Sequence, residues 1–484
     1  MDKLAVGKLW DKGGYLDRTV ERFTVGEDRG YDMRLLKADV VASIAHADML
    51  AAIGVLEVAE LTVLREALSE AIKEINAGQF RIGDDEEDGH TALERFLTER
   101  TGNAGKRIHT GRSRNDQVIA AMRLYAREWL LNFRTEIIEL ADDLLDFAEA
   151  WSETPMPGRT HMQPAMPSTV GLWAAAFAEE LIDDVDLVEC AYRRNNKSPL
   201  GAAAGYGVPL PLDREMVAKT LGFAGVQNNV LYVNNSRGVV EAQVAESAGR
   251  VCGTLAQLSQ DLMIFTLPEF GYFRLPEELT TGSSIMPQKR NPDLLELIRA
   301  KAALVDGQAA IIRSIILNLP SGYNRDMQQT KGPFLISLKE SADIVSVMRV
   351  TISRLSVDER RLEAGCNLEL LSADRAYKLV SEGVPFRDAY RQVGAELSGD
   401  FIEPQPAHTD VLSAALAKDY KGAPGNLSID ISRQAVEELR GSVASDRAVV
   451  TEALTKLAGP LGIDLTQQPA ESSLDRSANA TERR

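Results

Sequence analysis

Residues 115–151 read NDQVIAAMRLYAREWLLNFRTEIIELADDLLDFAEAW, and this stretch indicates the fold class. Its apolar side chains recur at the three- and four-residue spacing of a helix, and no proline interrupts it. The pattern is repeated in three further stretches of about 25 residues or more, at residues 237–266, 292–317 and 335–363. Runs in which β-branched residues alternate with polar ones are nearly absent. We therefore predict an all-α protein built on a long helical bundle.

Segments rich in proline and glycine divide the chain and should form the end loops of this bundle, at residues 155–167, 199–211, 275–292 and 319–333. We predict an N-terminal helical domain at residues 1–111, a central long-helix bundle at 112–365 and a smaller C-terminal helical domain at 366–465. Residues 466–484 are polar and are expected to form a flexible tail. Because the long stretches carry apolar residues on more than one face, several chains should associate through them.

The composition restricts the function classes. The chain has 54 basic and 71 acidic residues and a net charge of −17, so neither nucleic acid nor an anionic membrane is an expected partner. No segment has the pattern of a signal peptide or a membrane span, and three widely separated cysteines fit a reduced, cytoplasmic protein. The five histidines, at positions 46, 90, 109, 161 and 408, lack metal-ligand spacing. This spacing argues against a metal-dependent hydrolase, and we expect neither a metal nor another cofactor.

The most informative loop is residues 281–292, TGSSIMPQKRNP, directly before a strong helical pattern. Asn291 is a good N-cap and Pro292 suits the first helical turn, so the positive end of the helix should point at the loop and favour an anion there. Composition alone also allows a simpler interpretation, in which the segment is a capped helix with a flexible connection.

This loop resembles the signature of the fumarase and aspartase superfamily, Gly-Ser-Ser-x-Met-Pro-x-Lys-x-Asn-Pro, at all eight fixed positions from Gly282 to Pro292. The resemblance implies a homotetramer with a core of about 20 helices and an elimination that releases fumarate. It assigns catalysis to Ser283 and carboxylate binding to Lys289 and Asn291. The chemistry agrees, because proton removal beside a carboxylate builds a second negative charge that fixed donors must stabilise.

A second loop, residues 157–164 (PGRTHMQP), contains His161. A lone histidine is more often structural than catalytic, although this one lies between two long helical stretches. The segment resembles the superfamily block Thr-His-x-Gln, which implies proton transfer by His161 at the leaving group, a hydrogen bond from His161 to Glu296, and substrate contact by Thr160. Arg159 replaces the tyrosine usual in argininosuccinate lyases, and an arginine here is more typical of fumarases and adenylosuccinate lyases.

A third segment, residues 106–117 (KRIHTGRSRNDQ), has four Lys or Arg residues before its first acid, Asp116. It could be a basic loop with Asp116 opening the next helix, or it could bind an anion. It resembles the argininosuccinate lyase block Ser-Gly-Arg-Ser-Arg-Asn-Asp-Gln, with the first serine replaced by Thr110. The resemblance implies that Ser113, Arg114 and Asn115 help to hold the carboxylates of the substrate. Further along the chain, it implies contacts to the arginine and carboxylate parts of the substrate by three more residues: Tyr323, Gln328 and Lys331.

Together these segments are similar to the argininosuccinate lyase family, which cleaves argininosuccinate to L-arginine and fumarate in the last step of arginine biosynthesis. The family's sites are shared between subunits of a homotetramer. Two segments depart from its commoner pattern, residues 13–16 and 228–237. The alternatives are another fumarate-releasing lyase, such as an adenylosuccinate lyase, and a non-catalytic relative like the lens crystallins. Retention of Ser283, His161 and Lys289 argues against the second of these.

Overall fold

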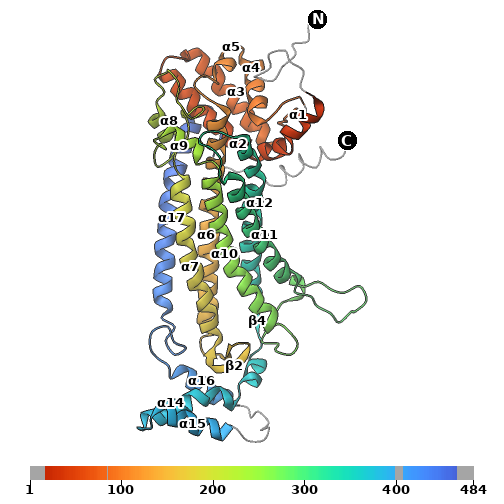
Figure 1. Ribbon diagram of the computed structural model, residues 1–484, viewed down its shortest axis with the longest axis vertical. Coiled ribbons are helices and arrows are strands. Elements are labelled where there is room, and N and C mark those ends of the chain that lie inside the picture. The colour runs from red at the N-terminus through yellow and green to blue at the C-terminus, as the bar shows by residue number, and fades with distance from the viewer. Residues whose placement is uncertain (1–16, 84, 398–406, 466–484) are drawn as a thin grey trace.

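The computed structural model describes residues 17–83, 85–397 and 407–465. Six long helices run side by side along the long axis of the molecule (Figure 1). They are α6 (Arg114–Ala150), α7 (Val170–Asn195), α10 (Val239–Phe265), α11 (Asp293–Ile316), α12 (Lys331–Arg354) and α17 (Ile429–Ala458). The all-α fold class is therefore confirmed, and the strands in the described residues are short.

Helix α6 shows how the sequence forms the bundle. Ser113 is its N-cap, and the Asp116 side chain accepts a 2.9 Å hydrogen bond from the Ser113 backbone N–H, so both ends of a capping box are present. Further along, paired apolar residues such as Leu130 and Leu131 are fully buried against the neighbouring helices. Each such side chain contributes about 1.5–3 kcal/mol by leaving water, so packing rather than local propensity holds a helix of this length in place.

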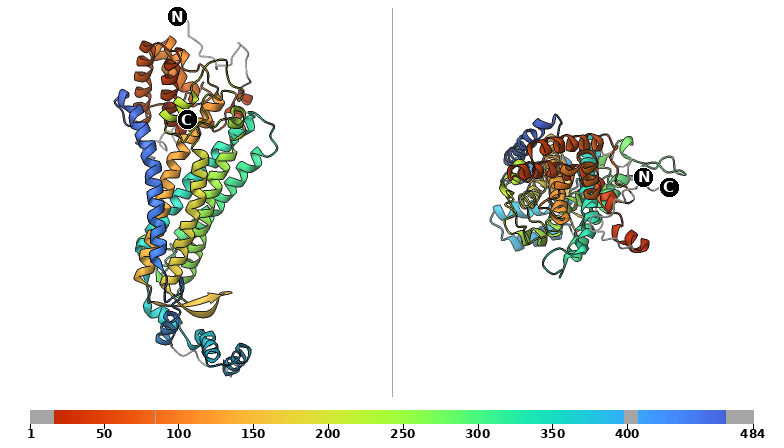
Figure 2. Two further views of the ribbon diagram at one scale, coloured as in Figure 1. Left: turned by 90° about the vertical axis from the view of Figure 1, so that its left-hand side faces the viewer. Right: turned by 90° about the horizontal axis from the view of Figure 1, so that it is seen from above.

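A further group of helices covers one end of the bundle (Figures 1 and 2). These are α1 (Arg18–Val25), α2 (Asp28–Ala52), α3 (Val58–Asn76), α4 (Gly89–Thr101), α5 (Asn103–Arg107), α8 (Arg214–Thr220) and α9 (Val230–Asn235). The 3-10 helices η2 (Arg325–Thr330) and η4 (Gly459–Leu461) also belong to this end, since η2 packs against the first turns of α12 and η4 against α3. Helix α2 packs along the first part of α6 and so ties these helices to the bundle.

The other end carries a β-hairpin and a group of small helices (Figure 1). Strands β1 (Pro155–Thr160) and β2 (Gln163–Thr169) pair antiparallel, and β3 (Phe273–Arg274) pairs antiparallel with β4 (Ser356–Val357). The remaining elements are α13 (Glu359–Gly365), η3 (Leu368–Leu371), α14 (Ser372–Ser381), α15 (Phe386–Leu397), α16 (His408–Leu416) and η1 (Glu277–Leu279). Among the described helices, none is long and apolar enough to cross a membrane.

Two local expectations were wrong. The predicted helix at 335–363 ends at Arg354, because residues 356–357 pair with β3 before α13 begins. The predicted end loop at 155–167 is a hairpin, and its prolines are tolerated because each strand of a two-stranded sheet has a free edge.

The domain boundaries stay a prediction. Helix α17, inside the predicted C-terminal domain, packs along α6 and α7 of the bundle. The predicted tail at 466–484 and the divergent segment at 13–16 lie outside the described residues.

Candidate active site

A pocket of about 180 Å³ lies at the covered end of the bundle. It forms where the first turn of α6, the junction of α1 and α2, the residues before α4 and the segment around η2 meet. Five of the predicted substrate-binding residues line it: Arg114, Asn115, Tyr323, Gln328 and Lys331. Its other lining residues are Thr24, Val25, Asp28, Glu87, Asp88, Val118, Arg237 and Arg325.

Arg114 and Asn115 reach the pocket from the first turn of α6. The Arg114 guanidinium donates to the Glu87 carboxylate at 2.7 Å and to the Thr91 hydroxyl at 3.0 Å. Ser113 itself serves as the helix cap and accepts a hydrogen bond from the Asn115 backbone N–H at 3.3 Å. Because the helix presents its positive end here, this wall of the pocket is suited to a carboxylate.

A second part of the pocket lining comes from the chain around η2, more than two hundred residues later. The Gln328 amide donates to the Thr24 carbonyl at 3.0 Å, which joins η2 to the end of α1. The Lys331 ammonium is buried between the carboxylates of Asp28, at 2.9 Å, and Asp32, at 2.6 Å. Burial lowers the pKa of Lys331, but the two carboxylates outweigh that effect and raise the pKa, so the amine stays protonated.

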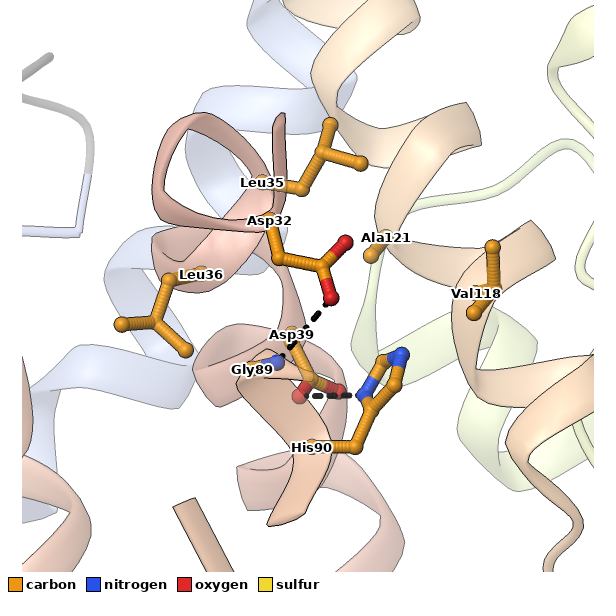
Figure 3. Close-up of a pocket in the computed structure, with 8 residues that line it drawn as sticks. All are labelled: Asp32, Leu35, Leu36, Asp39, Gly89, His90, Val118 and Ala121. Carbon is orange, nitrogen blue, oxygen red and sulfur yellow. Dashed lines mark hydrogen bonds and ion pairs between the residues drawn. The ribbon is translucent and has the colours of Figure 1, made fainter. Parts of the chain in front are cut away.

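A second, smaller cavity lies beside this pocket and is lined by α2, α4 and α6 (Figure 3). In it, Asp32 accepts the Gly89 backbone N–H at 3.0 Å, and the His90 imidazole pairs with Asp39 at 2.8 Å. Burial lowers the pKa of His90, but the neighbouring carboxylates, Asp39 first, raise it to about 9. His90 is therefore an imidazolium at neutral pH, and it anchors the start of α4 beneath the pocket.

The hairpin brings Thr160 and His161 to its exposed tip, at the other end of the bundle from the pocket (Figure 1). His161 and Met162 have φ angles of 52° and 64°, a region that costs a non-glycine residue energy and occurs often at functional sites. Arg159 donates to the Met162 carbonyl at 3.0 Å, and its guanidinium lies 4.7 Å from the centre of the Phe270 ring. In this chain Arg159 thus holds the tip in shape.

The loop at 281–292 extends away from the bundle (Figure 1). Thr281 and Asn291 exchange two backbone hydrogen bonds, of 3.0 and 2.8 Å, which close the loop at its base. Lys289 is exposed, and Ser283 is half-buried. The expected cap at Asn291 was wrong: α11 begins at Asp293, and its N-cap, Pro292, has no side-chain hydrogen bond.

A single chain does not bring together the pocket residues, the hairpin tip and the loop at 281–292. Helix α6 alone, with its 37 residues, is about 55 Å long at 1.5 Å per residue, and it separates Arg114 from the hairpin. No hydrogen bond joins His161 to Glu296 within the described parts of the chain, and Glu296 is exposed on the first turn of α11. The assignments to His161, Ser283, Lys289 and Glu296 stay predictions.

Sequence reasoning missed five charged pocket residues: Asp28, Glu87, Asp88, Arg237 and Arg325. No local pattern marks Asp28 or Arg325, since each lies within an ordinary polar segment. Glu87 and Asp88 lie in an acidic run at residues 84–88, and this run was the available signal. Among the described residues, no group of three or more histidine, cysteine, aspartate or glutamate side chains is placed to hold a metal ion.

The chain is similar in sequence to known lyases. The model of a family described as lyase matches residues 15–307. The argininosuccinate lyase of Sorangium cellulosum is 47% identical over 87% of this chain and 97% of its own length. That of Thermotoga neapolitana is 43% identical over 80% of this chain and 97% of its own.

Solved structures share the fold at lower identity. An EDDS lyase bound to formate superposes with a TM-score of 0.74 at 22% identity, covering 96% of this chain and 99% of its own. The class II fumarase of Schistosoma mansoni has a TM-score of 0.63 at 16% identity, covering 77% and 91% of the two chains. By its sequence relatives and its family match, this chain belongs to the argininosuccinate lyases, a branch of the lyase family.

Proposed function

We propose that this protein is an argininosuccinate lyase, which splits argininosuccinate into L-arginine and fumarate without a cofactor, as the last step of arginine biosynthesis. One observation carries the proposal: the pocket brings together five predicted substrate-binding residues from two segments more than two hundred positions apart. The pocket is also lined by both cations and carboxylates, which suits a substrate that itself carries carboxylates, an ammonium and a guanidinium group.

The reaction is a β-elimination. A proton leaves the carbon next to a carboxylate of the succinyl group, a carbon–carbon double bond forms, and the bond to the guanidinium nitrogen breaks with its electron pair leaving on that nitrogen. We propose that Ser283 takes the proton, with Lys289 and Asn291 holding the carboxylate whose negative charge grows. The first turn of α11 adds backbone N–H groups without a side-chain cap, and these favour the same charge.

His161 is proposed to act in proton transfer at the departing nitrogen, oriented by Glu296, while Thr160 contacts the substrate. The exposed tip of the hairpin leaves His161 free to meet a substrate held by other residues. Because α6 separates this tip from Arg114 and Asn115, we propose that a complete site needs more than one chain. The expected homotetramer would supply the hairpin, the 281–292 loop and the pocket from different subunits.

The direct test is to add argininosuccinate to the purified protein and follow fumarate by its ultraviolet absorbance. Steady formation of fumarate with an equal amount of arginine supports the proposal. Activity that a chelator abolishes and a divalent ion restores would contradict the cofactor-free mechanism. No fumarate from a well-folded oligomer would favour a non-catalytic, crystallin-like relative.

The second candidate is an adenylosuccinate lyase, which the sequence favours only through Arg159. In the structure this guanidinium bonds to the hairpin's own backbone, so it gives the alternative little support. The same assay with adenylosuccinate separates the two activities. The proposal also keeps the expectation of a cytoplasmic enzyme that binds neither nucleic acid nor membranes.

A further inference from the structure

The pocket is lined by four cationic side chains, and within the described residues three of them are paired with carboxylates. Arg114 and Arg325 both bond to Glu87, at 2.7 and 3.1 Å, and Lys331 bonds to Asp28 at 2.9 Å. The fourth cation is Arg237, which has no salt bridge to any residue that the structure describes.

Arg237 is nevertheless almost completely buried, with 3% of its surface exposed. Its side chain makes no hydrogen bond to the described part of the protein, and its buried Nε atom has no partner. The nearest acid along the chain, Glu241, accepts the backbone N–H of Gly238 at 2.6 Å. On the pocket side, the Arg237 guanidinium carbon lies 5.4 Å from the centre of the Tyr323 ring. The carboxylates of Asp28 and Glu241 attract the guanidinium electrostatically, but neither forms a salt bridge with it. A buried guanidinium without a hydrogen bond is costly for a fold, and a bound anion would offset that cost.

We propose that Arg237 binds the α-carboxylate of the arginine part of argininosuccinate. This inference rests on the proposed function, and it assigns a role to the segment at 228–237, which departs from the commoner family pattern. Its location favours the arginine end of the substrate, because Tyr323, on which Arg237 stacks, is predicted to contact that end. The succinyl carboxylates are assigned instead to the residues of the 281–292 loop.

The test uses arginine and agmatine, which is arginine without its α-carboxylate, as inhibitors of argininosuccinate cleavage. In Arg237→Met, the inhibition constant of arginine should rise roughly 10- to 100-fold, the usual effect of losing a charge-assisted hydrogen bond. The constants for agmatine and fumarate should not change. Arg237→Lys keeps the charge and should recover part of the affinity for arginine.

Arg325→Gln is the matched control, because Arg325 also lines the pocket but is already bonded to Glu87. It should leave the ratio of the two inhibition constants, arginine to agmatine, unchanged. Thermal unfolding separates binding from a purely structural role: Arg237→Met removes no hydrogen bond or salt bridge within the described protein, so it should unfold close to the wild-type temperature.

In an active enzyme, an unchanged ratio of the two inhibition constants in Arg237→Met would overturn the inference, and equal losses of affinity for arginine and agmatine give this result. A rise confined to the fumarate constant would place Arg237 at the succinyl end and also overturn it. Failure of the wild-type protein to cleave argininosuccinate is a different outcome, because it refutes the proposed function itself.

Discussion

The buried ion pair between His90 and Asp39 should make the stability of the fold depend on pH in the alkaline range. The two side chains lie 2.8 Å apart and are 8% and 3% exposed. In the folded protein the carboxylates around His90 overcome the effect of burial and raise its pKa from 6.5 to about 9. The folded chain thus holds this proton more tightly than the unfolded chain does.

The stabilisation is fully present below about pH 6.5 and is lost as the pH rises through 9. A rise in pKa of this size corresponds to about 3 kcal/mol of unfolding free energy per chain. Asp39→Asn should remove most of it, because the amide cannot pair with the imidazolium. At pH 6.5 the variant should therefore be the less stable protein, and at pH 9.5 the difference should largely disappear.

Urea unfolding of both proteins at pH 6.5 and 9.5, at one protein concentration, measures this difference. His46→Gln is a suitable control, because burial lowers the pKa of His46 well below its usual value and the ring stays neutral throughout this range. It should retain the full pH dependence of the wild type. Equal changes with pH in the wild type and in Asp39→Asn would refute the reasoning, since the ion pair would then not be the titrating unit.

Three further predictions concern the proposed catalytic residues. Ser283→Ala should lower turnover by roughly 10²- to 10⁴-fold while argininosuccinate binding, measured by calorimetry, is largely kept; normal turnover would remove Ser283 from the mechanism. Glu296→Gln should change the pH profile of the rate in the same way as a His161 variant does, and an unchanged profile and rate would show that the two do not act together. His161→Asn and Ser283→Ala chains, unfolded, mixed equally and refolded, should regain activity at about one quarter of their sites; no recovery in well-formed mixed oligomers would place both residues on one chain.

Much of the fold follows from local sequence patterns. The spacing of apolar residues and the absence of internal proline predicted α6, α10 and α11 to within two residues at either end. These features act over a few neighbouring positions, so they can be read without knowing the tertiary structure. The prediction was wrong at 335–363, where a helix ends because residues 356–357 pair with a strand some eighty positions earlier.

The candidate site also contains residues that local motifs predict and residues that only the tertiary structure reveals. Motifs within single segments predicted Arg114, Asn115 and Lys331 as substrate-binding residues, and all three line one pocket. The family resemblance could not indicate Arg237, because residues 228–237 depart from the family pattern. That Arg237 forms no salt bridge becomes visible only when the three-dimensional positions of the neighbouring carboxylates are known.

The charge balance of the pocket depends on contacts between residues far apart in the chain. Lys331 and Asp32 are separated by 299 positions, and their ion pair exists because the segment leading into α12 packs against α2. A helix is stabilised by hydrogen bonds between residues four positions apart, so a short stretch of consecutive residues is enough to predict it. The energy of an ion pair depends on distance and burial in three dimensions, and only the packed chain sets these.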